Sequence, residues 1–159
     1  MNPWTVLMLD DRDYRILEWL QSDADMPVHA IAERVNISPS ACSRRIARLR
    51  EDGYIRRTVV VLDRPLLDLR GTVYVIIRAH HSGDWLERFR ATVASIPEVL
   101  ECHRLAGNFD YLLKVVVRDV AHYDTVYKRL IARLDLNDVA AYISMETIKD
   151  CLLYTSPSP

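Results

Sequence analysis

The sequence has few of the residues that mark several familiar kinds of site. Its 159 residues include only three cysteines and four glycines. The cysteines, at positions 42, 102 and 151, are odd in number and show no CxxC spacing. We therefore expect neither a disulfide framework nor a metal site, and a reducing cytoplasm fits best. The glycines form neither GxGxxG nor GxxxxGK(S/T), which excludes the common loops that hold nucleotide phosphates.

The sequence also lacks long apolar runs and a large net charge. No apolar run approaches the roughly 18–20 residues of a membrane span, and the first ten residues lack the basic cluster of a secretory signal. We therefore expect a cytoplasmic protein without a membrane partner. Lys and Arg number 21 against 22 Asp and Glu, a formal net charge of −1. This balance excludes a basic coat over the whole chain.

One segment departs from this balance. Residues 34–57 carry seven arginines and no lysine, against only Glu51 and Asp52. An arginine presents a planar fork that can bind phosphate oxygens or a guanine edge through two hydrogen bonds. A run of charge can also be a solvated helix face, so the structural context of the segment has to decide between these interpretations.

Three helices are expected in the first 55 residues. Asp10 suits the N-cap of the first, whose apolar positions 16, 17 and 20 share one face. Pro27 opens the second, which has apolar positions 28, 31, 32 and 35 in helical register. Ser38-Pro39 suits the N-cap and first position of the third, and Gly53 suits its end. Two short helices joined by about three residues, after a scaffold helix, are typical of a helix-turn-helix.

The third helix has the two faces that a recognition helix needs. Cys42, Ile46 and Leu49 share the inner face, where a cysteine acts as a small buried hydrophobe. The N-terminal part of a recognition helix enters the major groove, and arginines at its end contact phosphates. The alternative is a three-helix bundle with an exposed basic helix that binds no DNA. The expected DNA-binding residues are Ser40, Ser43, Arg44 and Arg48 at base edges, Arg45, Arg56 and Arg57 at phosphates, and Ser38 at the helix start.

The second half has the pattern of a small α+β domain. Runs rich in β-branched residues predict strands at 72–77, 99–105, 111–117 and 139–148. Helical spacing after Trp85 and after Asp119 predicts two helices, giving the β-α-β-β-α-β order of a ferredoxin-like unit. Two helices cover only one face of such a sheet, so the other face predicts a symmetric dimer. Alternatively, the extended run at 58–62 covers that face within one chain.

Three motifs stand out along the chain. The first is LDxxDxxIL at residues 9–17, and the second runs from Ala32 to Ile55 and includes Ile37-Ser38-Pro39. The third is GNFDYLL at residues 107–113. Together these motifs resemble the Lrp/AsnC, or feast/famine, family of transcription regulators. The resemblance covers about residues 9–150 and implies a winged-type helix-turn-helix, a linker strand and a ferredoxin-like effector domain. It divides the chain into a DNA-binding domain at 1–55, a linker at 56–70 and an effector and oligomerisation domain at 71–150. Residues 151–159 do not resemble the family and are expected to be a disordered or foreign tail.

The resemblance also implies a function and partners. Members are sequence-specific regulators that bind promoter DNA, form dimers and often octamers, and commonly sense an amino acid. We expect the effector at Gly107, Asn108, Phe109, Asp110 and Tyr111, where Asp110 can accept an ammonium and backbone N–H groups can bind a carboxylate. Alternatively, Gly107 only makes the turn and Asp110 only caps it. No other cofactor is expected.

Two other classes of function compete with a regulator. An enzyme would need a convergent set of groups, and the only suggestive pairs, His80-His81 and Cys102-His103, alternate across extended backbone. We therefore expect no catalytic residues. The second class is an effector-binding or assembly module of the same fold that does not bind specific DNA, against which the arginine-rich helix argues.

Overall fold

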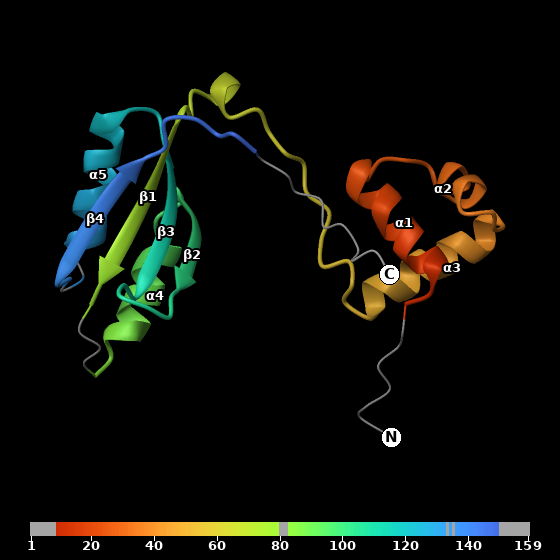
Figure 1. Cartoon of the computed structure of the whole chain (residues 1–159), viewed down its shortest axis with the longest axis horizontal. Coiled ribbons are helices and arrows are strands. Elements are labelled where there is room, and N and C mark those ends of the chain that lie inside the picture. Colours follow the sequence, from red (N-terminus) through yellow and green to blue (C-terminus); the bar gives the residue numbers. More distant parts are fainter. Residues whose placement is uncertain (1–8, 80–82, 133, 135, 150–159) are drawn as a thin grey trace. The chain divides into compact units, whose positions relative to one another are not determined.

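The computed structural model describes residues 9–79, 83–132, 134 and 136–149 of the chain (Figure 1). These residues form two compact units. One contains the residues up to Val61, and the other comprises Leu62–Ile148.

The first unit contains three helices, α1 (Asp11–Ser22), α2 (Val28–Arg34) and α3 (Pro39–Glu51), and no strand among residues 9–61. The expected caps are confirmed. The Asp10 carboxylate accepts a hydrogen bond from the Asp13 N–H at 2.9 Å, and the Ser38 hydroxyl accepts one from the Ala41 N–H at 3.3 Å. Gly53 ends α3 at a φ of +82°.

A small apolar core holds these three helices together. The buried side chains come from the faces that the periodicity predicted, and Cys42 is fully buried among them. Each of these side chains is at most 5% exposed; they are Ile16, Ile31, Ala32, Val35, Cys42, Ile46 and Leu49.

The second unit is the expected ferredoxin-like βαββαβ domain. Its elements are β1 (Gly71–Arg78), α4 (Trp85–Ala94), β2 (Val99–Arg104), β3 (Tyr111–Val117), α5 (Val120–Ile131) and β4 (Asp138–Ile143). The strands form one sheet in the order β2-β3-β1-β4, and every pair is antiparallel. Both helices pack on one face of the sheet, behind the strands in Figure 1.

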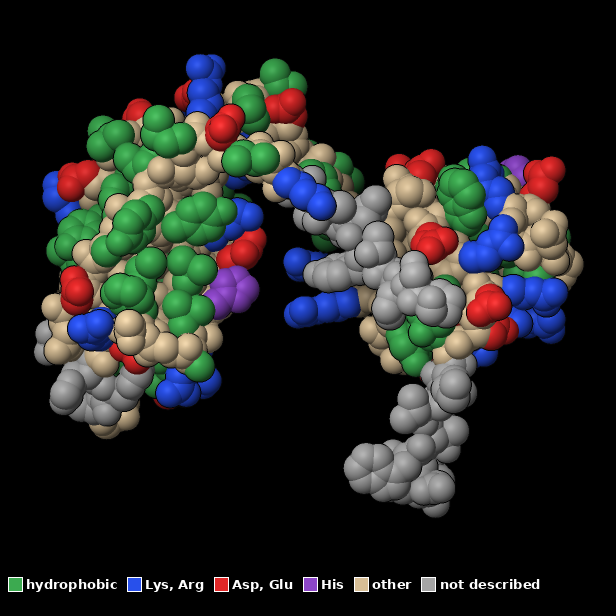
Figure 2. Space-filling view, viewed as in Figure 1, with side chains coloured by type: hydrophobic (Ala, Val, Ile, Leu, Met, Phe, Trp, Pro, Cys, Tyr) green, Lys and Arg blue, Asp and Glu red, His purple; other side chains and the backbone are tan. Residues whose placement is uncertain are grey.

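The opposite face of the sheet is the exposed face that the element order predicted. Tyr74 of β1 and Tyr142 of β4 are register partners on this face, and their side chains are 37% and 55% exposed. Figure 2 shows hydrophobic side chains gathered over it.

Two expected strands differ from the structure. Residues 56–62 lie in no strand, and Val59, Val60 and Val61 are exposed, so the linker strand is wrong for the single chain. A strand needs a partner for its N–H and C=O groups, and no described segment supplies one here. The final strand ends at Ile143 instead of residue 148, because its pairing with β1 ends at the register pair Val73–Ile143.

Candidate functional site

The outer surface of α3 carries the polar residues that the sequence placed there. Ser40, Ser43 and Arg44 are exposed, whereas the side chains of the inner face are buried. The Ser38 and Ser40 hydroxyl oxygens lie 3.2 Å apart at the start of the helix, so the N-cap residue also orients its neighbour. The proline at the first helical position fixes the backbone there. These groups therefore project from a rigid helix terminus.

Arg45 and Arg48 have a structural partner that the sequence did not reveal. Arg45 Nη1 donates to Asp13 Oδ1 at 2.8 Å and to Asp10 Oδ2 at 2.8 Å. Arg48 Nη2 donates to the second oxygen of Asp13, and its Nε lies 3.9 Å from Asp52. Asp13 is only 1% exposed, and it is the one buried charged residue described in the first unit. A single carboxylate on α1 therefore holds two arginines of α3.

The charges of this network stabilise one another. A hydrogen bond from the backbone N–H of Asp13 lowers the pKa of Asp10, and the Arg45 guanidinium lowers it further, although burial opposes both effects. Hydrogen bonds to Asp13 and Asp10 raise the pKa of Arg45. The arginine side chains remain 25% and 41% exposed, for Arg45 and Arg48 respectively. Part of each guanidinium is therefore held by carboxylates of α1 and its N-cap, and the rest remains accessible to solvent.

Arg56 and Arg57 follow the end of α3. Both are exposed. The turn before them is fixed, because the Ile55 N–H donates to the Leu49 carbonyl at 3.1 Å and Ile55 packs against the core of the unit. The two arginines thus begin at a defined point beside α3.

The expected effector loop lies between β2 and β3. Asp110 closes its base: its carbonyl accepts from the Leu105 N–H at 2.8 Å and its N–H donates to the Ile77 carbonyl at 2.9 Å. One carboxylate oxygen of Asp110 accepts from the Ala79 N–H at 2.9 Å. The carboxylate therefore ties the loop to the end of β1, which is more than a cap on its own turn.

Arg78 at the end of β1 is a residue of this site that the sequence reasoning missed. Its Nε and Nη2 donate to the Asn108 carbonyl at 3.1 and 2.8 Å. Its guanidinium carbon lies 5.5 Å from the centre of the Phe109 ring. The only available signal was an arginine closing an apolar strand, which a surface residue would also give.

Gly107 and Tyr111, two further residues expected at the effector site, differ in their surroundings. Gly107 has no positive φ, and a Cβ added to it would meet no atom within 4 Å. The backbone conformation at this position therefore does not require glycine. Tyr111 is 3% exposed and packs among Trp85 and Phe89 on the helix side of the sheet, away from the loop.

The other candidate sites do not assemble among the described residues. The pair His80-His81 lies outside them. Cys102 faces the helix side of the sheet, whereas His103 Nε2 lies 3.3 Å from Glu101 Oε2, so these neighbours do not converge. Within the described ranges, no group of three His, Cys, Asp or Glu side chains could hold a metal ion. Across those same residues, no helix is long and apolar enough to cross a membrane.

Comparison with known proteins covers both units. Residues 9–56 match the family model for a winged helix-turn-helix DNA-binding domain, and residues 72–152 match that of the Lrp/AsnC ligand binding domain. The chain is 50% identical over 143 residues to the HTH-type transcriptional regulator Zrp of Zymomonas mobilis, covering 89% of this chain and 94% of Zrp.

Solved structures agree with this result. An AsnC family transcriptional regulator from Agrobacterium tumefaciens has 44% identity and a TM-score of 0.85, covering 95% of this chain and 97% of that one. A transcriptional regulator from Neisseria meningitidis, crystallised as an L-Met complex, has 29% identity and a TM-score of 0.88, covering 94% of this chain and 97% of that one.

Proposed function

Since the chain belongs to the Lrp/AsnC family of DNA-binding transcription regulators, we propose that it reads a specific promoter sequence through α3 and responds to an amino acid bound at residues 107–110. The transcription regulators that make up the family are not enzymes. In this proposal, residues 1–55 bind DNA and residues 56–70 link them to the second domain. Residues 71–150 bind the effector and hold copies of the chain together, and the protein acts in the cytoplasm.

The exposed start of α3 is the observation that best supports sequence-specific DNA binding. Ser40, Ser43 and Arg44 lie on a surface with no acidic neighbour in the first turn of the helix. Arg44 binds a base edge, because a guanidinium can bind guanine through two hydrogen bonds. Arg56 and Arg57 bind phosphates, which fix position without reading sequence.

Arg45 and Arg48 have a double role in this proposal. Asp13 fixes their position on the face of α3, and their exposed nitrogen atoms donate to DNA, Arg48 at a base and Arg45 at a phosphate. Ser38 contributes through the helix start. A prearranged guanidinium loses less conformational entropy on binding than one that is mobile beforehand.

The DNA proposal is tested by selecting binding sites from a random DNA library and measuring affinities at several salt concentrations. Arg44→Ala is expected to relax sequence preference at one or two base pairs, at a cost of about 1–3 kcal/mol for the preferred site. Arg57→Ala is expected to weaken binding to all sequences and to reduce the salt slope by about 1. Arg88→Ala, at an exposed arginine of the second unit, is the control. Selection of no common sequence by the unaltered chain would favour the alternative, a module without specific DNA binding.

The loop at 107–110 supports the amino-acid proposal through its open space at Gly107 and its carboxylate at Asp110. One oxygen of Asp110 is held by the Ala79 N–H, which orients the carboxylate so that its charge can attract an ammonium. Backbone N–H groups near Gly107 and Asn108 bind the effector carboxylate. The L-Met complex of the Neisseria relative supports an effector of this class.

A thermal-shift screen of the twenty amino acids tests this proposal, because a ligand of the native state raises the apparent melting temperature. Asp110→Asn is the matched variant, since an amide oxygen can still accept from the Ala79 N–H while the charge is gone. We expect at least one amino acid to stabilise the unaltered chain and to lose most of its effect on Asp110→Asn. No shift with any amino acid would remove the effector proposal and leave DNA binding in place.

Assembly of several copies completes the proposal. The exposed sheet face with Tyr74 and Tyr142 supports a symmetric dimer, because large apolar faces are rarely left in water. Dimers that associate further would give tetramers or octamers. Sedimentation of the unaltered chain and of Tyr142→Glu tests this step: the variant is expected to sediment as a smaller species.

A further inference from the structure

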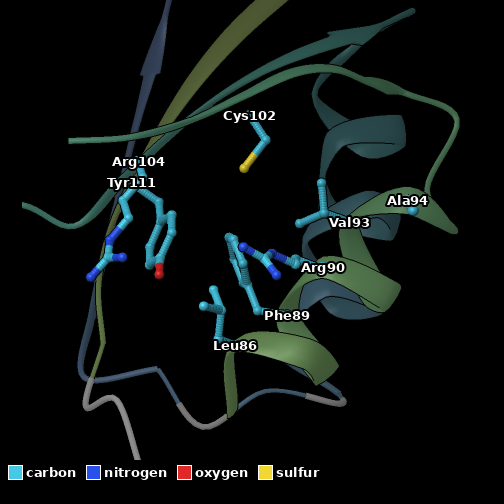
Figure 3. Close-up of a pocket in the computed structure, with 8 residues that line it drawn as sticks. All are labelled: Leu86, Phe89, Arg90, Val93, Ala94, Cys102, Arg104 and Tyr111. Atoms are coloured by element: carbon cyan, nitrogen blue, oxygen red, sulfur yellow. The ribbon is translucent and has the colours of Figure 1, made fainter. Parts of the chain in front are cut away.

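A pocket of about 300 Å³ opens between α4 and β2, on the helix side of the sheet (Figure 3). Leu86, Phe89 and Val93 of α4 supply its apolar wall. Binding sites for small molecules in proteins typically measure about 300–1,000 Å³ and combine an apolar lining with a few polar groups. The pocket therefore has the size and lining of a site for a ligand as small as an amino acid.

Two neutral polar groups face this space. Figure 3 shows the Cys102 thiol directed from β2 toward the side of α4 that carries Phe89 and Val93. Burial raises the pKa of the Cys102 thiol, so the sulfur is protonated at neutral pH. Burial also raises the pKa of Tyr111, an effect that the positive charges of Arg104 and Arg90 partly offset. Neither the thiol nor the phenol brings a charge to the pocket.

The charge of the pocket comes from Arg90 of α4 and Arg104 of β2. They lie on either side of the Tyr111 ring in the view of Figure 3. No described residue that lines the pocket is an acid. Arg90 Nη1 donates to Glu87 Oε1 at 3.0 Å, but these side chains are 65% and 74% exposed. An exposed ion pair of this kind is weak, so Arg90 can exchange it for a ligand.

We propose that this pocket binds a small carboxylate with an apolar tail and no ammonium group; a branched-chain 2-oxo acid has these features and serves as the probe. The tail packs against Leu86, Phe89 and Val93, and the carboxylate accepts hydrogen bonds from Arg90 and Arg104. An α-amino acid fits poorly, because its ammonium would lie beside two guanidinium groups without a facing acid.

The pocket is separate from the proposed effector loop at residues 107–110, and binding to it does not depend on that loop. The loop offers the carboxylate of Asp110 to an ammonium, whereas the pocket offers only positive charge. The two sites therefore favour ligands with and without an ammonium group, respectively.

Isothermal titration of the full chain with 4-methyl-2-oxopentanoate, and separately with leucine, tests the pocket. We expect the oxo acid to bind the unaltered chain and Asp110→Asn alike, and Arg104→Gln to bind it about tenfold more weakly or worse. Arg88→Gln is the control, because Arg88 is an exposed arginine of α4 outside the pocket lining. Equal binding by Arg104→Gln, loss of binding in Asp110→Asn, or no binding to the unaltered chain would each overturn the proposal. If only the effector-loop proposal were wrong, the thermal-shift screen would show no effect of any amino acid, while binding of the oxo acid would be unchanged.

A second measurement needs no variant. Cys102 is exposed at the pocket while Cys42 is buried, so a maleimide reagent followed by peptide mass spectrometry reports on the pocket thiol. At a ligand concentration of ten times the Kd, the oxo acid is expected to slow alkylation of Cys102 about 11-fold, since only the unoccupied fraction reacts. An unchanged rate at saturating oxo acid would show that the ligand binds elsewhere and would overturn the assignment.

Discussion

Replacement of Asp13 by asparagine tests how α3 is held in place. The Asp13 carboxylate accepts from Arg45 Nη1 at 2.8 Å, from Arg48 Nη2, and from the Asp10 N–H at 3.2 Å. Asparagine keeps the size of the side chain and one acceptor oxygen. It removes the charge and turns an NH₂ donor toward an arginine that is itself only a donor. Two charge-assisted hydrogen bonds between α1 and α3 are therefore lost or weakened.

The expected cost follows from this geometry. Hydrogen bonds to charged groups contribute about 1.5–3 kcal/mol each, and leaving a buried charge without a partner costs about 3–5 kcal/mol. The arginines here are 25% and 41% exposed, and Arg45 retains its 2.8 Å contact with Asp10. Water and Asp10 thus compensate part of the loss. We expect Asp13→Asn to lower the free energy of unfolding of the first unit by about 2–3 kcal/mol.

Native-state hydrogen exchange of the amides in α3 measures this quantity for the first unit by itself. The matched control is Asp11→Asn in the same turn of α1, where the carboxylate is exposed and only a dipole interaction of about 0.3–1 kcal/mol is lost. DNA affinity gives a second readout. If Asp13 positions Arg45 and Arg48, specific binding weakens, whereas non-specific binding strengthens because a negative charge is gone. A stability loss no larger than that of Asp11→Asn would refute the reasoning.

Three further outcomes are expected. Gly53→Ala lowers the free energy of unfolding by about 1 kcal/mol because the φ of Gly53 is +82°. Gly107→Ala introduces neither strain nor a close contact, so it changes the free energy of unfolding by no more than about 0.5 kcal/mol. Urea unfolding of both variants checks this difference. Phe89→Ala destabilises the second unit by about 3–5 kcal/mol, since the ring is 2% exposed, and a loss under 1 kcal/mol in thermal unfolding would contradict that packing. Because the pKa of Asp10 is lowered on folding, its contribution is present above its unfolded pKa, near 4, and disappears as the pH falls through the lower folded value. Unfolding measured from pH 6 to pH 3 checks this, with Asp10→Ala expected to flatten the profile.

The elements of both units could be predicted from the sequence because their signals are local. The N-cap at Asp10, the Ser38-Pro39 start and the left-handed Gly53 each depend on neighbours within a few residues. The inward face of α3, including Cys42, follows from helical periodicity alone. The order of strands and helices then limited the second unit to one common topology. The arginine-rich helix and the GNFD loop, as candidate sites, were visible for the same reason.

The end of β4 and the linker at 56–62 could not be predicted in this way. Both segments are rich in β-branched residues, so local propensity favours a strand in each. Whether a strand forms depends on a partner, and the pairing of β4 with β1 ends at Ile143, opposite Val73. Propensity describes what a segment tolerates, whereas pairing is a property of the whole sheet.

The sequence by itself determined the family resemblance, the two kinds of unit and the face of α3 that carries Ser40 and Arg44. Only the tertiary structure joined Asp13 to Arg45, 32 residues along the chain, and Arg78 to the Asn108 carbonyl, 30 residues along it. It likewise placed Arg104 across a pocket from α4. The physical reason is that a cap or a helical face is fixed by a few adjacent residues. The partner of a charged side chain is fixed by the packing of distant elements, which no local pattern encodes.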